Sequence, residues 1–446
     1  MKIEKINIYN FRGFGETHIS FNDNVNLFIG NNGAGKSTLL NAIVKNIFTL
    51  TKDFVEGVSN EMKSKLALTS KDYKHRSIEF CIIKTTLTYP KSSNSINLLI
   101  YRNTKSVALK ADLEALSKDK EKIDKFQDKI IESKRVPIIK FYPTNRGAIS
   151  YKEPIDIVSN KIPQLDAWTH IYQDQLSYSS FFDWFFENES KELRFKRDEN
   201  DFNVELPQLK VVRDAIIIAL KKLFHKDYEI VSEQYKREGT NTFIKTISIV
   251  EKETKQKESL DAKSDGEKAI IALVADIAYN LSIAANPEDE DILANPGIVL
   301  IDEIEQHLHP TWQRAIVPLL TELFPNIQFF ITTHSPQVVS SVKSENIFLI
   351  NDFKVEPLQF KTKGIDSNTL LEYVFNSFER PEEYLNLVKK FENLIDEKAE
   401  PEKVEAVINE IDHLTNQDTG KDIDSLPSEL RIRLAAYKFE LENEVH

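Results

Sequence analysis

The sequence predicts an α/β fold with a parallel sheet that carries a phosphate loop, an antiparallel β lobe, a helical insertion and a helical C-terminal region. Three observations support this prediction. The apolar run Val25–Ile29 leads directly into a glycine-rich loop. Residues 78–89 and 96–101 are rich in β-branched and aromatic side chains, which is typical of strands. From Ser264 onward, helical and strand patterns alternate, as a parallel sheet requires.

The remaining elements follow from local patterns of apolar residues. Alternation of Ile3, Ile6 and Ile8 with polar residues predicts a first strand. Interleaved charges predict a solvated amphipathic helix over residues 110–135. The aromatic cluster at residues 181–186 is expected in the core rather than on an exposed interaction surface. Further helices are expected at 36–47, 209–224, 269–285 and beyond 366, and further strands at 136–142, 228–231, 242–250, 298–301, 327–332 and 347–350.

Composition restricts the classes of partner. The net charge of −12 argues against binding nucleic acid through the overall field of the protein, and leaves only a local basic patch for that role. Residues 381–446 hold 17 acidic against 8 basic side chains, which fits either a solvated helical face or a docking surface for a basic partner. Cys81 is the single cysteine, so we expect a cytoplasmic protein without an internal disulfide. No apolar run reaches the roughly 18 residues of a membrane-spanning helix.

The glycine-rich loop reads Gly-Asn-Asn-Gly-Ala-Gly-Lys-Ser and matches the phosphate-loop pattern G-x-x-x-x-G-K-[ST]. Its glycines let successive backbone N–H groups turn towards phosphate oxygens, and the start of the next helix adds positive partial charge. Lys36 is expected to bridge the β- and γ-phosphates, and the Ser37 hydroxyl to bind Mg²⁺. The predicted nucleotide-binding residues of this loop are Gly30, Asn31, Asn32, Gly33, Ala34, Gly35, Lys36, Ser37 and Thr38.

Two acids follow the apolar run at residues 298–301. An unbroken apolar run is typical of a buried parallel strand, and ligands bind at the carboxyl ends of such strands. Asp302 is therefore expected to hold the Mg²⁺ shell, and Glu303 to polarise the attacking water as a general base. A strand that simply ends in two solvated acids is the alternative, and the phosphate loop elsewhere in the chain argues against it.

Two further segments complete the candidate site. His334 follows the next predicted strand and is expected to reach the γ-phosphate, although a packed surface histidine is the alternative. The turn at residues 264–268, Ser-Asp-Gly-Glu-Lys, precedes a long apolar helix and can hold a phosphate at the helix N-terminus. Taken alone, such a turn is also a common way to begin a helix.

The order of these motifs resembles that of ABC-type ATPases. Residues 10–14, Asn-Phe-Arg-Gly-Phe, look like the opening of the RecF and SMC branch. Residues 302–310, Asp-Glu-Ile-Glu-Gln-His-Leu-His-Pro, are similar to stand-alone ATPases of bacterial anti-phage systems, as are residues 142–146 and 182–185. Within that group the chain resembles the Septu ATPases, PtuA, and the ATPases encoded beside retrons. The resemblance covers residues 1–365.

The resemblance implies a homo-oligomer that contains at least a head-to-head dimer. ATP would lie between Lys36 of one head and the turn containing Ser264 and Gly266 of the other, and hydrolysis at Glu303 would release the heads. Arg12 is implied near the nucleotide. The resemblance also implies ATP and Mg²⁺ as cofactors, a separate effector nuclease of the HNH type as partner, and contact with nucleic acid through that partner.

The same reading divides the chain into four regions. Residues 1–150 form ATPase lobe I with the phosphate loop, and residues 151–260 form a mixed helical and β insertion. Residues 261–365 form ATPase lobe II with the signature turn, the acidic pair and His334, and residues 366–446 form an acidic helical region for assembly or partner docking.

Several features depart from the family pattern. Asp265 stands where the signature more often has Ser or Gly, and the glutamine that usually contacts Mg²⁺ has no assigned position. Long coiled-coil arms and an acidic nuclease motif are also missing from the sequence. The leading hypothesis is therefore an ATP-controlled regulator of a separate nuclease in anti-phage defence. A RecF-like DNA-repair ATPase that binds DNA by itself, and an ATP-bound scaffold with little turnover, are the alternatives.

Overall fold

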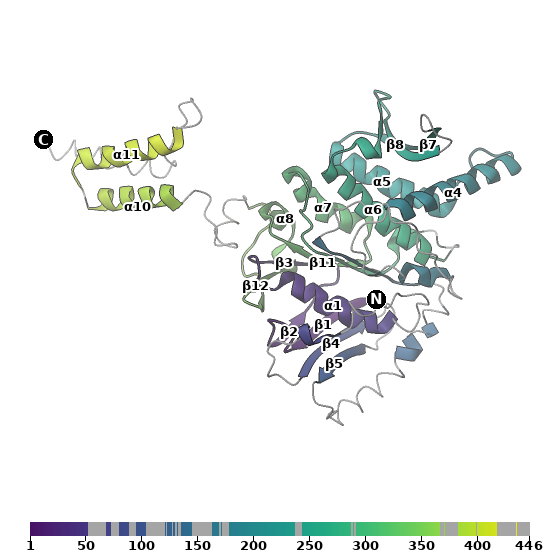
Figure 1. Cartoon of the computed structure of the whole chain (residues 1–446), viewed down its shortest axis with the longest axis horizontal. Helices are drawn as coiled ribbons and strands as arrows, with labels where there is room; N and C mark the ends of the chain where they lie inside the picture. Colours follow the sequence, from purple (N-terminus) through teal and green to yellow (C-terminus); the bar gives the residue numbers. More distant parts are fainter. Residues whose placement is uncertain are drawn as a thin grey trace. The chain divides into compact units, whose positions relative to one another are not determined.

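The computed structural model describes residues 1–51, 68–72, 80–88, 95–103, 121, 123–126, 128–129, 132, 135–144, 163–168, 171, 178–236, 243–286, 289, 291–365, 370, 382–397, 399–416 and 434. The chain separates into two compact units, Met1–Leu370 and Leu371–His446. The first unit holds the sheets and the phosphate loop, and the second holds two C-terminal helices (Figure 1). The division into four regions stays a prediction.

A six-stranded sheet forms the centre of the first unit, in the order β13-β12-β3-β11-β10-β6. Five strands run parallel, and β13 pairs antiparallel with β12 at one edge. Every residue of β3, β6, β10 and β11 is buried, which explains their apolar runs and confirms the predicted parallel sheet. The strands are β3 (Val25–Ile29), β6 (Ile138–Tyr142), β10 (Gly297–Ile301), β11 (Ile327–Thr333), β12 (Ile347–Asn351) and β13 (Lys354–Pro357).

A four-stranded antiparallel sheet, β2-β1-β4-β5, forms the β lobe. Helix α1 (Lys36–Thr51) contacts β4 and β5 on one side and β11 on the other, so it lies between the two sheets (Figure 1). The buried amide of Gln328 joins the sheets directly, because it accepts a hydrogen bond from the Ile3 nitrogen at 2.7 Å and donates one to the Ile3 oxygen at 2.9 Å. The strands are β1 (Lys2–Tyr9), β2 (Glu16–Ser20), β4 (Phe80–Thr88) and β5 (Ile96–Asn103).

Helices α5, α6 and α7 cover the face of the parallel sheet opposite α1 (Figure 1). Helix α4 packs on α5 and α6, and α8 packs on α7. A small antiparallel sheet, β7-β8-β9, adjoins α5. The helices are α4 (Tyr178–Asp198), α5 (Pro207–Phe224), α6 (Asp265–Ala284), α7 (Pro310–Leu323) and α8 (Pro336–Ser341), and the strands are β7 (Tyr228–Lys236), β8 (Phe243–Glu251) and β9 (Lys257–Ser259). Short 3₁₀ helices span Ser70–Asp72, Pro163–Trp168, Leu260–Ala262, Ile292–Ala294 and Ser344–Asn346.

The structure describes only part of the region that the sequence analysis assigned to an insertion. Its aromatic cluster lies on α4, where Phe185 and Phe186 are buried, so the core prediction is confirmed for these two residues. The side chains of residues 178–183 lie outside the described residues, as does most of the helix expected over 110–135. Near the start of the chain, strand β2 was not predicted, because its sequence Glu-Thr-His-Ile-Ser is mostly polar.

A buried polar cluster ties the edge strand β6 to the middle of α6. The Tyr142 hydroxyl donates to Asp276 Oδ2 at 2.6 Å, and Lys140 Nζ lies 3.2 Å from the same oxygen. The side chain of Asn280 donates to the Asp276 backbone oxygen at 2.6 Å. These partners explain how the otherwise apolar helix α6 accommodates Asp276 and Asn280 in its buried face.

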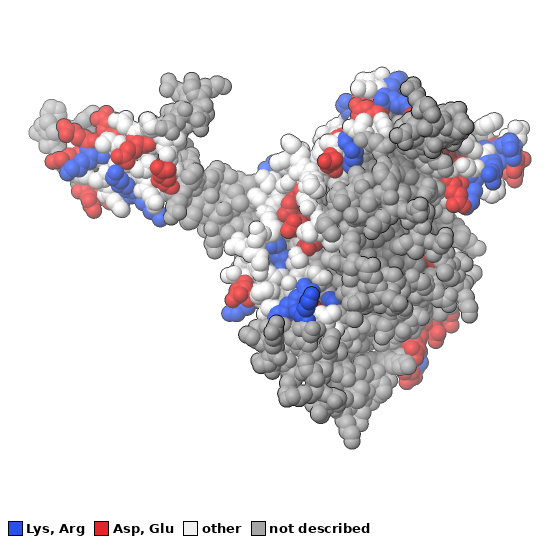
Figure 2. Space-filling model, in the orientation of Figure 1, with Lys and Arg blue, Asp and Glu red and all other residues white. Residues whose placement is uncertain are grey.

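The described part of the C-terminal unit contains α10 (Glu382–Asp396) and α11 (Pro401–Asn416). The two helices share their own small core of buried side chains, made of Tyr384, Phe391, Val404, Val407 and Ile411. Acidic and basic side chains are interspersed on the face of these helices seen in Figure 2. Across the part of the chain that the structure describes, no helix combines the length and apolar character needed to cross a bilayer.

Candidate functional site at the carboxyl edge of the parallel sheet

Three loops leave neighbouring strands of the parallel sheet at the same edge. Thr333, the last residue of β11, lies opposite Ile29, the last residue of β3. Ile331 of β11 lies opposite Ile301, the last residue of β10. The phosphate loop, the segment containing His334 and the acidic pair therefore emerge side by side, at the edge where parallel sheets bind ligands.

The backbone of the phosphate loop depends on two of its glycines. Gly30 and Gly35 have φ angles of 149° and 116°, which side chains other than hydrogen rarely allow. A Cβ on Gly30 would lie 2.1 Å from the backbone oxygen of Ile350, and one on Gly35 would lie 2.6 Å from the ring of Phe353. The Phe353 nitrogen also donates to the Ala34 oxygen at 2.9 Å. The turn between β12 and β13 thus supports the loop, whose crest at residues 31–33 is exposed.

Lys36 folds back over the loop from the start of α1. Its Nζ donates to the backbone oxygens of Gly30 at 2.8 Å and Asn31 at 3.0 Å. Burial lowers the pKa of Lys36 to about 8, although the carboxylates of Asp302, Glu303 and Glu305 act in the opposite direction. Lys36 therefore still carries its charge at neutral pH, close to three acids, and a bound triphosphate would strengthen its charged form.

A single threonine fixes both members of the acidic pair. The Thr332 hydroxyl donates to Asp302 Oδ1 at 2.5 Å and accepts from the Glu303 nitrogen at 2.8 Å. Asp302 is buried, whereas Glu303 is half-buried and has a φ angle of 47°. The sequence did not single out Thr332, because its role depends on lying level with Asp302 in the neighbouring strand.

His334 lies within electrostatic reach of the same residues. Burial lowers the pKa of His334, and the charge of Lys36 lowers it further, while Glu305 and Asp302 raise it. The neutral imidazole is therefore favoured around neutral pH, and it can donate one hydrogen bond to a phosphate oxygen. The structure thus brings Lys36, Asp302, Glu303 and His334 together, as their order in the sequence predicted.

The predicted Mg²⁺ ligands have suitable chemistry. Ser37 supplies a half-buried hydroxyl in the first turn of α1, and Asp302 supplies a carboxylate whose orientation Thr332 fixes. Oxygen donors of this kind are the ligands that Mg²⁺ prefers. When bound, the ion would neutralise phosphate charge between these two residues.

The signature turn is rigid and exposed. Ser264 caps α6 in a reciprocal arrangement with Glu267, in which each side chain bonds the other residue's backbone nitrogen. Ser264 and Asp265 are exposed, whereas Gly266 is buried against the backbone of His307. A Cβ on Gly266 would lie 2.4 Å from the His307 oxygen, so only glycine fits this close approach.

Arg12 is anchored by hydrogen bonds to Asp72. Its nitrogen and its Nε donate to the backbone oxygen and Oδ1 of Asp72, at 2.8 Å and 3.0 Å. Lys45 of α1 lies 3.4 Å from the other oxygen of that carboxylate. Gly13 and Gly35 both pack on the ring of Phe353, which brings this turn next to the phosphate loop. A contact of Arg12 with nucleotide stays a prediction.

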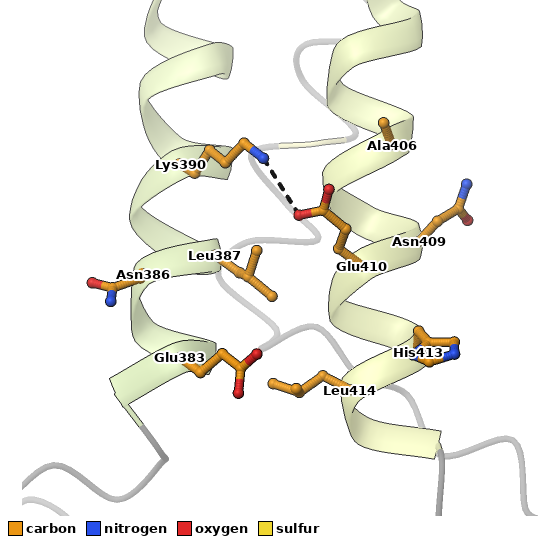
Figure 3. A pocket seen from close by; sticks show the side chains of 9 residues that line it. All are labelled: Glu383, Asn386, Leu387, Lys390, Ala406, Asn409, Glu410, His413 and Leu414. Carbon is orange, nitrogen blue, oxygen red and sulfur yellow. Dashed lines mark hydrogen bonds and ion pairs between the residues drawn. The ribbon is translucent and has the colours of Figure 1, made fainter.

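An open groove of about 830 Å³ lies on the C-terminal unit. Figure 3 shows Leu387 of α10 and Leu414 of α11 pointing into the space between the helices, and Lys390 reaching across to Glu410 at 3.3 Å. None of its lining residues belongs to the motifs that the sequence analysis assigned to nucleotide binding. The groove is lined by Glu383, Asn386, Leu387, Lys390, Ala406, Asn409, Glu410, His413 and Leu414.

Similarity to known proteins shows which family the chain belongs to. Residues 25–340, more than half of the chain, match a family model described as "AAA domain, putative AbiEii toxin, Type IV TA system". The chain belongs to this family. This AAA-domain ATPase is 28% identical over 438 residues to the Retron Vc95 probable ATPase of Vibrio cholerae. The aligned region covers 89% of this chain and 84% of that protein.

A second relative of the AAA-domain ATPase is the Septu protein PtuA of Bacillus mycoides, which is 24% identical over 345 residues, 75% of this chain and 38% of PtuA. The resemblance predicted from the sequence is therefore confirmed. Among solved structures, the SMC head bound to the C-winged helix domain of ScpA covers 81% of this chain and 98% of that chain, with 15% identity and a TM-score of 0.46.

Proposed function

We propose that the chain is an ATP-controlled regulator of a separate effector nuclease in bacterial anti-phage defence. ATP would join two copies head to head, and its hydrolysis would separate them. The observation that carries the ATP chemistry is the convergence of Lys36, Asp302, Glu303 and His334 at one sheet edge. The defence role is supported by the relatives, which are named after a retron and the Septu system. The proposed setting is the cytoplasm.

The site residues have distinct proposed roles. Loop N–H groups and Lys36 bind the phosphates, and Ser37 and Asp302 hold Mg²⁺. Glu303 takes a proton from the attacking water, and its backbone nitrogen is held by Thr332 at 2.8 Å. His334, as neutral imidazole, donates to the γ-phosphate and makes the switch segment respond to its presence. We assign Arg12 and Thr38 peripheral roles in binding the nucleotide.

The head-to-head dimer is supported by the geometry of the signature turn. Ser264 and Asp265 are exposed at the N-terminal end of α6, where helix N–H groups favour a phosphate. The turn is already rigid, because Ser264 is engaged with Glu267 and Gly266 is fixed on His307. A second copy's γ-phosphate would meet a prearranged site, so little conformational entropy would be lost on binding.

The acidic C-terminal unit is the proposed docking region for the nuclease. Residues 381–446 carry 17 acidic against 8 basic side chains, which favours a basic partner surface. The groove between α10 and α11 exposes Glu383 and Glu410. Nucleic acid would be contacted through the partner.

Co-purification tests this function. The chain is expressed together with the product of an HNH-nuclease gene beside its own gene, and nuclease activity is measured with ATP, ADP or no nucleotide. We expect a stable complex whose nuclease activity changes with ATP. In Lys36→Ala the complex should persist while the response to ATP disappears. Failure to co-purify, or an unchanged nuclease activity with ATP, would overturn the proposal.

Surface variants locate the docking region. The double substitution Glu383→Lys and Glu410→Lys should weaken co-purification, because both carboxylates line the groove. Glu345→Lys is the matched control, since Glu345 is also exposed but lies in the first unit. Equal effects of the two variants would place docking elsewhere. Tight binding of duplex DNA by the chain alone, weakening steeply with salt, would instead favour the DNA-repair alternative.

A further inference from the structure

The carboxylate of Glu305 binds the segment at residues 333–335, called here the switch segment, through both of its oxygens. The Thr333 hydroxyl donates to Glu305 Oε2 at 2.7 Å, and the His334 backbone nitrogen donates to Glu305 Oε1 at 2.6 Å. Glu305 comes from the turn after β10, whereas Thr333 ends β11 and His334 follows it. A half-buried carboxylate with two hydrogen bonds to one short segment restricts that segment strongly, because bonds to a charged acceptor are short and strong.

Gln313 of α7 forms a second bridge between the same two segments. Its Nε2 donates to the Leu308 oxygen at 2.8 Å, and the Ser335 hydroxyl donates to its Oε1 at 2.6 Å. The Ser335 nitrogen in turn donates to the Thr333 hydroxyl at 3.0 Å. The turn at residues 305–308 and the switch segment at 333–335 are therefore joined at both ends into one hydrogen-bonded unit.

The position of Glu305 differs from that of the reacting groups. Its two bonds are to the backbone of His334 and the side chain of Thr333, and not to the phosphate loop. Its charge nevertheless reaches the site, because it partly offsets the lowering of the pKa values of both Lys36 and His334. Glu305 is thus placed to set where the imidazole stands without taking part in the chemistry itself.

We propose that Glu305 is a positioning residue for ATP hydrolysis, which fixes the backbone of His334 so that its ring faces the γ-phosphate beside Glu303. This inference rests on the site assignment proposed above. It adds that the switch histidine is held by the turn that follows the acidic pair, and that Gln313 secures the same turn from α7. A displacement of His334 by nucleotide must therefore move the 305–308 turn as well.

The experiment measures steady-state ATP hydrolysis by the full chain with Glu305→Ala and Glu305→Gln. In Glu305→Ala both hydrogen bonds disappear, and we expect kcat to fall about 10- to 100-fold while KM for ATP changes less than about twofold, since misplacement of about 1 Å costs that much. In Glu305→Gln the amide oxygen can accept from the His334 nitrogen and the amide nitrogen can donate to the Thr333 hydroxyl. Glu305→Gln should therefore recover most of kcat.

A double-variant cycle with His334→Ala identifies the route of the effect. If Glu305 acts through His334, adding Glu305→Ala to His334→Ala lowers kcat by less than about twofold, because the two changes remove one shared function. Independent, multiplicative losses would overturn the proposal. So would Glu305→Gln as slow as Glu305→Ala, or an unchanged kcat in Glu305→Ala.

The site assignment is tested separately in the same assay. If Glu303→Gln and His334→Ala both hydrolyse ATP at the wild-type rate, the assignment of the site fails, whatever Glu305 does. If these two variants are slow and Glu305→Ala is not, only the role of Glu305 is wrong. Thermal melting of each variant shows that the protein is folded, and Glu305→Gln, which keeps the size of the side chain, provides a result even if Glu305→Ala unfolds.

Discussion

Lys140, on the edge strand β6, forms a buried ion pair of 3.2 Å with Asp276 in the middle of α6. Lys140 is 1% exposed, and Tyr142 donates to the same carboxylate at 2.6 Å. The pair joins the sheet that carries the candidate nucleotide site to α6, the helix that follows Ser264. A buried charge must be compensated locally, since transfer of an ion from water into a protein interior is costly.

Asp276→Asn removes the negative charge and keeps an oxygen that can accept from Tyr142. We expect a loss of about 3–5 kcal/mol in the free energy of unfolding, because Lys140 stays buried beside a neutral amide. Urea unfolding measures this loss. The double substitution Lys140→Met and Asp276→Asn should recover most of it.

An exposed pair in the same unit is the matched control. Lys221 and Asp227 lie 2.7 Å apart with side chains 62% and 53% exposed. Asp227→Asn should lower the free energy of unfolding far less than Asp276→Asn does, because water screens both charges. An Asp276→Asn variant as stable as Asp227→Asn would show that the buried pair is not a major source of stability.

Gly266→Ala tests the close approach of the signature turn to His307. The added Cβ would lie 2.4 Å from a backbone oxygen, which cannot rotate away as a side chain can. We expect a loss of about 1–3 kcal/mol in stability together with slower ATP turnover. Thermal melting and phosphate release measure the two effects.

Asp265→Ser is the control for that substitution. The Asp265 side chain is 87% exposed, so its replacement should change stability by less than about 0.5 kcal/mol. A Gly266→Ala protein that melts and turns over like Asp265→Ser would mean that the turn and residue 307 are free to move apart.

Glu303→Gln separates nucleotide binding from hydrolysis. Loss of a general base should slow turnover by about 10²- to 10⁴-fold, while ATP affinity is retained because Lys36 and the loop are unchanged. Size-exclusion chromatography with ATP should then show a persistent dimer. Equal turnover of wild type and Glu303→Gln would favour the scaffold alternative, in which ATP is bound and scarcely hydrolysed.

The pKa of Lys36 predicts a pH-dependent affinity. The nucleotide-free protein holds this proton below pH about 8 and releases it above. Without Mg²⁺, ATP affinity should fall by up to about tenfold per pH unit above that pH, because only the ammonium attracts phosphate. Fluorescence titration with a labelled ATP analogue measures this change. In Lys36→Arg the affinity should not fall as the pH rises above about 8, since a guanidinium stays charged.

The ionisation of Lys36 should also affect the free energy of unfolding, which should rise with pH where the ATP affinity falls. The folded-state pKa of Lys36 lies below its ordinary value, so above pH about 8 the unfolded chain binds the additional proton. This group's contribution to the free energy of unfolding therefore increases as pH rises through that window.

The sequence revealed those parts of the fold that local chemistry determines. The strands β3, β10 and β11 were predictable because both faces are buried, which requires unbroken apolar runs. The phosphate loop was predictable because its geometry requires glycines. The roles of Thr332 and Glu305 were not, because they depend on the register of β11 against β10 and on a turn that faces it. A single sequence does not show which residue of one strand lies opposite which residue of the next.

Helix α4 illustrates the same limit. It was expected within a mixed region, yet it is one helix of 21 residues. Its Glu192 is buried because Arg213 of α5 donates to it at 2.9 Å. Lys196 of the same helix also lies 3.1 Å from Glu192, and such a pair four residues apart is typical of an exposed helix surface. The contact with Arg213 comes from another helix, so the local pattern did not show it.

The left-handed backbone of Glu303 places two requirements in conflict. A φ angle of 47° costs a residue with a Cβ about 1–3 kcal/mol, and glycine would relieve most of that strain. Glycine would also delete the proposed base. Selection for a more durable fold and selection for faster turnover therefore act against each other at a single codon. Among descendants that had lost catalysis, position 303 is where we would expect a stabilising replacement to spread early.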